Sequence, residues 1–124
     1  MNEVFETENP AETPADHQAE YPWHHLESQR LDAMQTLGHL EREDHRQPTP
    51  ENREAVLEKR AEVEAIIQEE LKMMESKLNE LEDKERIENR AGNELPVDEK
   101  SRLAELRQVI DIAHDRLDRI KRGQ

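Results

Sequence analysis

Residues 103–120, LAELRQVIDIAHDRLDRI, contain the most regular apolar pattern in this chain of 124 residues. Apolar residues recur at alternating spacings of three and four, at Leu103, Leu106, Ile110, Ala113, Leu117 and Ile120. This is the heptad spacing of a helix that packs along a neighbouring helix. The pattern predicts a helix that starts near Pro96 and ends at about Lys121.

A longer helix is expected upstream, from about Glu51 to Asn89. Thr49 is its expected N-cap, with Pro50 at the first helical position. Gly92 or Asn93 is expected to end the helix in the left-handed conformation. Its apolar stripe consists of Val56, Val63, Ile67, Leu71, Met74, Leu78 and Leu81.

The first helix is expected to run from Trp23 or His24 to His45, where Pro48 and Pro50 follow closely. Arg30 is the polar exception on its apolar face. The apolar residues that share this face are Trp23, Leu26, Ala33, Leu37 and Leu40.

The relative lengths of the helices predict how they pack. The two outer helices cannot both lie beside the central one along its whole length, so they should overlap only near residues 66–74. Apolar residues are doubled there, as Ile66-Ile67 and Met73-Met74, as a helix with two neighbours requires. The expected fold is all-α and elongated: residues 23–124 form antiparallel, coiled-coil-like helices in the order helix, turn, long helix, turn, helix.

Composition narrows the class of partner. Charged residues make up 40% of the chain, and the formal net charge is −13. An acidic surface argues against direct binding to nucleic acid or to an anionic membrane, and it favours a basic protein partner. The chain shows no cysteine, no secretory-signal pattern and no long apolar stretch, so a cytoplasmic protein is expected.

Residues 1–22 differ from the rest of the chain. They hold six of the acidic residues, three prolines and no Lys or Arg, which predicts a disordered acidic tail that serves only solubility. The alternative is a docking peptide, because Phe5, Tyr21 and Trp23 are the only aromatic residues and lie in or beside this tail. These three side chains are therefore candidate anchors for a partner.

Acidic residues also gather at the two expected turns. Glu43 and Asp44 lie at the first turn, and Glu94, Asp98 and Glu99 lie at the second. Carboxylates at the ends of hairpins are suited to contacting basic residues of a partner, and these five are candidate partner-binding residues. The alternative is that they serve helix capping and solubility.

No catalytic, cofactor or metal site is expected. The chain has no cysteine nucleophile, and its three glycines form no phosphate-binding loop. Asp111 and His114 have the carboxylate-x-x-His spacing of half a di-iron site, but the chain has no Glu-x-x-His partner motif. The histidines are therefore interpreted as residues of the helix surface.

Residues 78–122, LNELEDKERIENRAGNELPVDEKSRLAELRQVIDIAHDRLDRIKR, resemble a family of small, uncharacterised actinobacterial helical-hairpin proteins. The resemblance lies in Glu80-Leu81, Arg102-Leu103, Leu106 and Asp115-Arg116-Leu117, while Ala113-His114 replaces the Trp region of that family. It implies only a helical hairpin, because that family has no known activity. The third helix also resembles the coiled-coil hairpin of RNA polymerase secondary-channel regulators, whose zinc-binding cysteines this chain lacks.

These patterns predict a non-enzymatic protein–protein interaction module: an adaptor, an assembly factor or a small structural component. The alternative is an acidic inhibitor or regulator that occupies a basic nucleic-acid-binding surface, as a DNA mimic or an RNA polymerase regulator does. Outside the expected overlap near residues 66–74, only two helices pack together, and such two-helix arms bury little surface. A homodimer is therefore a further expectation. Ionic contacts would weaken in salt, whereas apolar helix packing would not.

Overall fold

The computed structural model describes residues 22–123, which form three helices and no strand. Helix α2 spans His24–Arg46, α3 spans Pro50–Arg90 and α4 spans Val97–Lys121. The all-α prediction is confirmed, and the helix boundaries agree with those expected from the sequence to within about a residue. The expected disordered tail lies almost wholly outside the described residues.

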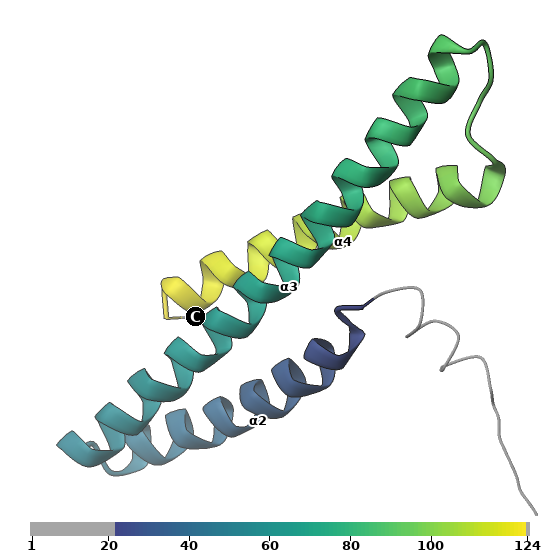
Figure 1. The fold of residues 1–124 in the computed structure, drawn as a ribbon. Helices are drawn as coiled ribbons and strands as arrows, with labels where there is room; N and C mark the ends of the chain where they lie inside the picture. The colour runs from purple at the N-terminus through teal and green to yellow at the C-terminus, as the bar shows by residue number, and fades with distance from the viewer. Residues whose placement is uncertain (1–21, 124) are drawn as a thin grey trace, which may run out of the picture.

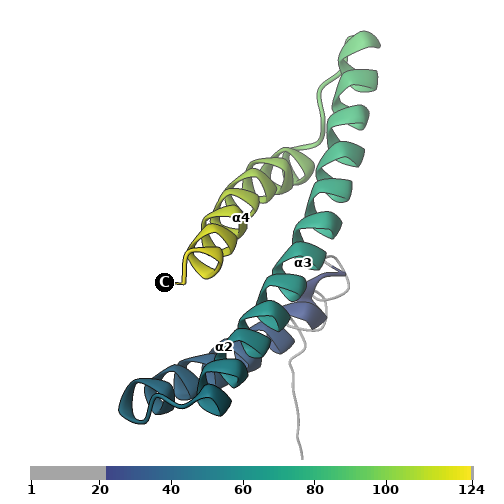
Figure 2. The same ribbon diagram turned by 90° about the vertical axis from the view of Figure 1, so that its left-hand side faces the viewer.

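The long helix α3 is the axis of an elongated molecule (Figure 1). Helix α2 packs along its N-terminal part and α4 along its C-terminal part, with the two turns at opposite ends (Figure 2). The helices contain 23, 41 and 25 residues. At ~1.5 Å per residue, α2 and α4 together exceed the length of α3 by roughly 10 Å, so they must overlap near its middle.

The first turn is short, and hydrogen bonds satisfy backbone groups at the ends of both α2 and α3 there. The Thr49 hydroxyl accepts a hydrogen bond from the Asn52 backbone N–H at 3.0 Å, and Pro50 occupies the first position of α3. The Asn52 side chain also donates to the carbonyl of Gln47 at 2.7 Å. The N-cap that the sequence predicted at Thr49 is confirmed.

The second turn is longer and depends on glycine. Gly92 has φ of +82°, the left-handed conformation that ends α3. The backbone N–H of Asn93 then donates to the carbonyl of Glu88 at 2.8 Å. Leu95 is only 3% exposed, so the turn is anchored to the core by an apolar side chain before Pro96 starts α4.

A single apolar core runs along all three helices. The expected stripes of α3 and α4 are buried, with only Leu78 partly exposed, and Val63, Ile67 and Leu106 are the most completely covered. The doubled apolar pairs widen the core at the middle of α3. Ile67 and Met74 are buried there, while Ile66 and Met73 pack against the same core from its edge.

Candidate interaction surfaces

The aromatic candidates have different outcomes. Phe5 and Tyr21 lie outside the described residues, whereas Trp23 is 5% exposed and belongs to the core. Trp23 lines a small cavity together with Leu106 and Val109 of α4, so the start of α2 is covered by α4. The indole ring of Trp23 is therefore already buried within its own chain, and its role as an anchor for a partner stays a prediction.

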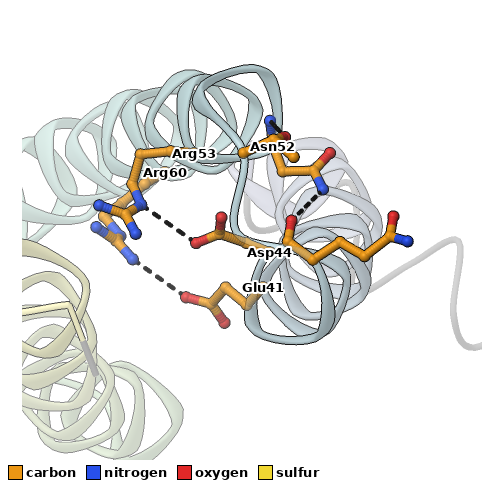
Figure 3. Close-up of polar contacts among 7 residues, drawn as sticks. Glu41, Asp44, Asn52, Arg53 and Arg60 are labelled. Atoms are coloured by element: carbon orange, nitrogen blue, oxygen red, sulfur yellow. Dashed lines mark hydrogen bonds and ion pairs between the residues drawn. The ribbon is translucent and has the colours of Figure 1, made fainter.

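The acidic residues of the first turn face basic residues of the same chain (Figure 3). Arg53 donates to Asp44 at 3.3 Å, and Arg60 donates to Glu41 at 3.2 Å. Glu43 is paired with Arg46 one turn further along α2. The second carboxylate oxygen of Asp44 is buried and accepts no hydrogen bond from residues 22–123.

Acidic residues of the second turn also form ion pairs with basic residues of the same chain. Lys84 donates to Glu99 at 2.6 Å, and Lys100 donates to Glu94 at 2.6 Å. The hydrogen bond from Lys100 lowers the pKa of Glu94, and the hydrogen bond to Glu99 raises the pKa of Lys84. Asp98 is exposed and forms no ion pair with the rest of residues 22–123. Of the candidate acidic residues at the two turns, Asp98 is therefore the one without an ion pair among residues 22–123.

Pairing leaves both turns only mildly acidic. Residues 41–54 contain five acidic and three basic residues, a net charge of −2. Residues 82–100 contain seven acidic and four basic residues, a net charge of −3. Exposed ion pairs contribute little to stability, about 1 kcal/mol or less each, but they reduce the charge that a turn presents to a partner.

The C-terminal arm of α3 has an uncovered side. Helix α2 begins at His24, and beyond this N-terminal end an open hollow of about 560 Å³ follows α3. Pro22, immediately before Trp23, and Met73 line this hollow with Lys77 and Glu80. Further along the same side, Ile87 is 65% exposed. The spacing of these α3 residues places them on one face of the helix.

The N-terminal arm of α3 also has an uncovered side. Gly123, just after the end of α4, lies next to the Arg60 guanidinium, which places the end of α4 near Arg60. Leu57, one turn beyond Arg60 along α3, is 53% exposed. Each arm of α3 is therefore covered by one helix, and only the middle of α3 has neighbours on two sides.

A buried ion pair lies at this middle. Arg30 of α2 donates to Glu70 of α3 at 2.9 Å, and their side chains are 4% and 3% exposed. Burial raises the pKa of Glu70, and the nearby Arg30 charge offsets only part of this rise. Burial also lowers the pKa of Arg116 on α4, and the positive charge of Arg30 lowers it further.

Sequence reasoning singled out Arg30 but missed Glu70 and Arg116. A signal for Glu70 existed, because it stands three residues after Ile67 and four before Met74, a spacing that places it beside the buried stripe. An acidic residue beside the stripe of α3 and a basic residue in the stripe of α2 could have been matched as a buried pair. Arg116 gives no such signal, since it lies among other basic residues near the end of α4.

Comparison with protein-family models, curated proteins and solved structures finds no match for this chain. Within residues 22–123, none of the helices is long and apolar enough to cross a membrane. In the same residues, no group of three or more His, Cys, Asp or Glu side chains is placed to hold a metal ion. His114, half of the spacing considered for a di-iron site, lies 3.5 Å from Glu75 on the surface.

Proposed function

We propose that this chain is a non-enzymatic, cytoplasmic protein–protein interaction module, an adaptor, assembly factor or small structural component, that binds a helix of its partner. The observation that carries the proposal is the uncovered side of α3, where Met73 lines the hollow and Ile87, further along the same face, is exposed. A partner helix lying there would complete a three-helix arm. Helix-in-groove recognition reads apolar anchors at spacings of three, four and seven residues.

The charge of this region indicates the chemistry of the partner. Residues 73–90 contain six acidic and four basic residues, a net charge of −2, in a chain whose net charge is −13. Lys77 is already bound to Glu80 at 2.7 Å, so it offers little charge to a partner. An amphipathic helix with an apolar stripe flanked by Lys or Arg fits such a surface, with apolar contacts giving affinity and basic residues aiding association.

The test is capture from lysate with the full chain and two matched variants, at low and high salt. Ile87→Gln removes the apolar contact on α3, while Leu31→Gln removes an exposed leucine of α2 from a different helix. We expect a partner that survives high salt, binds the Leu31→Gln variant normally and binds the Ile87→Gln variant roughly tenfold more weakly. A partner indifferent to Ile87→Gln would refute docking on this face.

Self-association is measured in parallel by sedimentation of the same proteins. If the second copy of this chain is the occupant, the wild type will dimerise, and the Ile87→Gln variant will dimerise less. A wild-type protein that stays monomeric at high concentration excludes the homodimer and leaves a different helical protein as the occupant.

A second candidate function is an acidic inhibitor or regulator that occupies a basic nucleic-acid-binding surface. The observation that favours it is the concentration of six carboxylates, without Lys or Arg, in residues 1–22. The turns are less suitable for this role, since most of their candidate acids already bind basic residues of the same chain. A partner held at low salt, lost at high salt and unaffected by Ile87→Gln would support this second function.

A further inference from the structure

The junction where α2 and α4 meet over α3 contains a cavity of about 160 Å³. Its charged wall is formed by Glu27 and Arg30 of α2, Glu70 of α3 and Arg116 of α4. Apolar side chains, Trp23 and Ile112 among them, form much of the remaining wall. The cavity therefore combines buried charge with an apolar surface, which is the usual composition of a small-ligand site.

The charged groups of this wall are not all paired by hydrogen bonds or ion pairs. Arg30 and Glu70 form one ion pair, and the side chain of Glu27 is 51% exposed and 3.8 Å from Arg30. Arg116 is partly buried, yet it makes no hydrogen bond and no ion pair with any of residues 22–123. The wall thus carries two guanidinium groups and two carboxylates, and Arg116 is the group whose N–H donors have no acceptor among residues 22–123.

Electrostatics at Arg116 point the same way. Burial and the positive charge of Arg30 lower the pKa of Arg116, and the carboxylates of Glu70 and Glu27 offset only part of this effect. A guanidinium group has five N–H donors, and leaving them without acceptors in a partly buried position is unfavourable. A bound anion would supply these acceptors.

We propose that this cavity binds one carboxylate group, held by Arg116, with an apolar part of the ligand against Trp23 and Ile112. The flat fork of a guanidinium group matches a carboxylate. A doubly charged phosphate is less suitable, because the carboxylates of Glu27 and Glu70 face the same cavity and would repel it.

Such a carboxylate has two sources. One is a small monocarboxylic acid from solution. The other is the chain itself, because residues 1–22 contain six carboxylates, and Glu20 stands only three positions before Trp23. Three residues of chain span at most ~10 Å, and Trp23 itself lines the cavity.

Trp23 is the only tryptophan, so its fluorescence reports directly on this cavity. The full chain is titrated with butyrate, and with butyramide as a neutral probe of the same shape. We expect a saturable change with butyrate and none with butyramide. The butyrate response should weaken at least about tenfold in Arg116→Gln, partly return in Arg116→Lys and persist in Arg119→Gln, since Arg119 is exposed and binds Asp115.

A second full-length variant, with all six acidic residues of 1–22 replaced by their amides, separates the two sources. A butyrate response in the wild type assigns the site to a small molecule from solution. A response only in the amide variant shows that a carboxylate of the chain itself occupies the site in the wild type. No butyrate-specific response in either protein, or one that survives Arg116→Gln in a chain that circular dichroism shows to be folded, would overturn the proposal.

Discussion

The two hairpins share α3 but are held together by different means. In the C-terminal hairpin, α4 buries an uninterrupted apolar seam of six residues. In the N-terminal hairpin, the buried residues of α2 are Leu26, Ala33, Leu37 and the charged Arg30. A regular apolar seam is enough to specify how α4 packs on α3. The packing of α2 on α3 also requires a partner for the buried charge of Arg30, and Glu70 supplies it.

The ion pairs at the rims of the hairpins also differ. Acidic Glu41 and Asp44 of α2 meet basic Arg60 and Arg53 of α3. At the other end the polarity is mixed, because Lys84 of α3 binds Glu99 of α4 while Arg107 of α4 binds Glu82 of α3. These exposed pairs are individually weak, so we interpret them as favouring the correct register rather than as the main source of stability.

The strongest way to break the N-terminal hairpin is Arg30→Met. It leaves the Glu70 carboxylate buried without its main partner, which costs about 3–5 kcal/mol. The double variant Arg30→Met/Glu70→Leu removes both charges and should regain the wild-type free energy of unfolding or exceed it by about 1–4 kcal/mol. Urea unfolding of the three proteins measures both effects. A double variant as unstable as the single one would show that the ion pair itself holds α2.

The matching change in the C-terminal hairpin is Leu106→Ala. Leu106 is 1% exposed, so the substitution removes buried apolar surface and leaves a cavity, at a cost of about 2–5 kcal/mol. The control Leu31→Ala, at a position that is 56% exposed, should change stability by no more than about 0.5 kcal/mol. Equal losses at the two positions in urea unfolding would contradict the burial assigned to the α4 seam.

Glycine substitutions compare a turn of one hairpin with a helix of the other. Gly92→Ala places a side chain at φ of +82° and should cost about 1 kcal/mol. Gly38→Ala lies within α2, where the new Cβ would meet only the Arg42 side chain at 3.6 Å, so stability should rise by about 0.5–1 kcal/mol. Thermal unfolding should therefore shift in opposite directions. Shifts of the same sign would mean that one of these backbone assignments is wrong.

The two hairpins were not equally predictable from sequence. Helix boundaries, the Thr49 cap and the α4 seam follow from local spacing and capping chemistry, which the sequence displays directly. The Arg30–Glu70 pair joins positions 40 residues apart, so it depends on how the helices cross. The burial of Trp23 depends on the same kind of contact, because α4, which is distant in the sequence, lies over the start of α2.

The last comparison is between two carboxyl groups whose pKa values shift in opposite directions. Burial raises the pKa of Glu70 above its ordinary value of 4.5, so the folded state binds its proton at a higher pH than the unfolded chain does. Ionised Glu70 therefore costs stability at neutral pH, and this cost disappears as the pH falls toward 4.5. Relative to Glu70→Gln, the wild type should gain stability on acidification within this window.

Glu94 should behave in the opposite way, because its hydrogen bond from Lys100 lowers its pKa below 4.5. The contribution of Glu94 is present above pH 4.5 and is lost as the pH falls through the lowered pKa. Urea unfolding of the wild type, Glu70→Gln and Glu94→Gln at neutral pH, near pH 4.5 and below it measures both slopes. The exposed Glu94 pair should give the smaller difference, and salt should weaken it further, whereas the buried site should respond little to salt. Parallel pH profiles for the two variants would mean that water reaches Glu70 more than its burial indicates. The expected contrast between Glu70 at the junction and Glu94 at the exposed turn would then be absent.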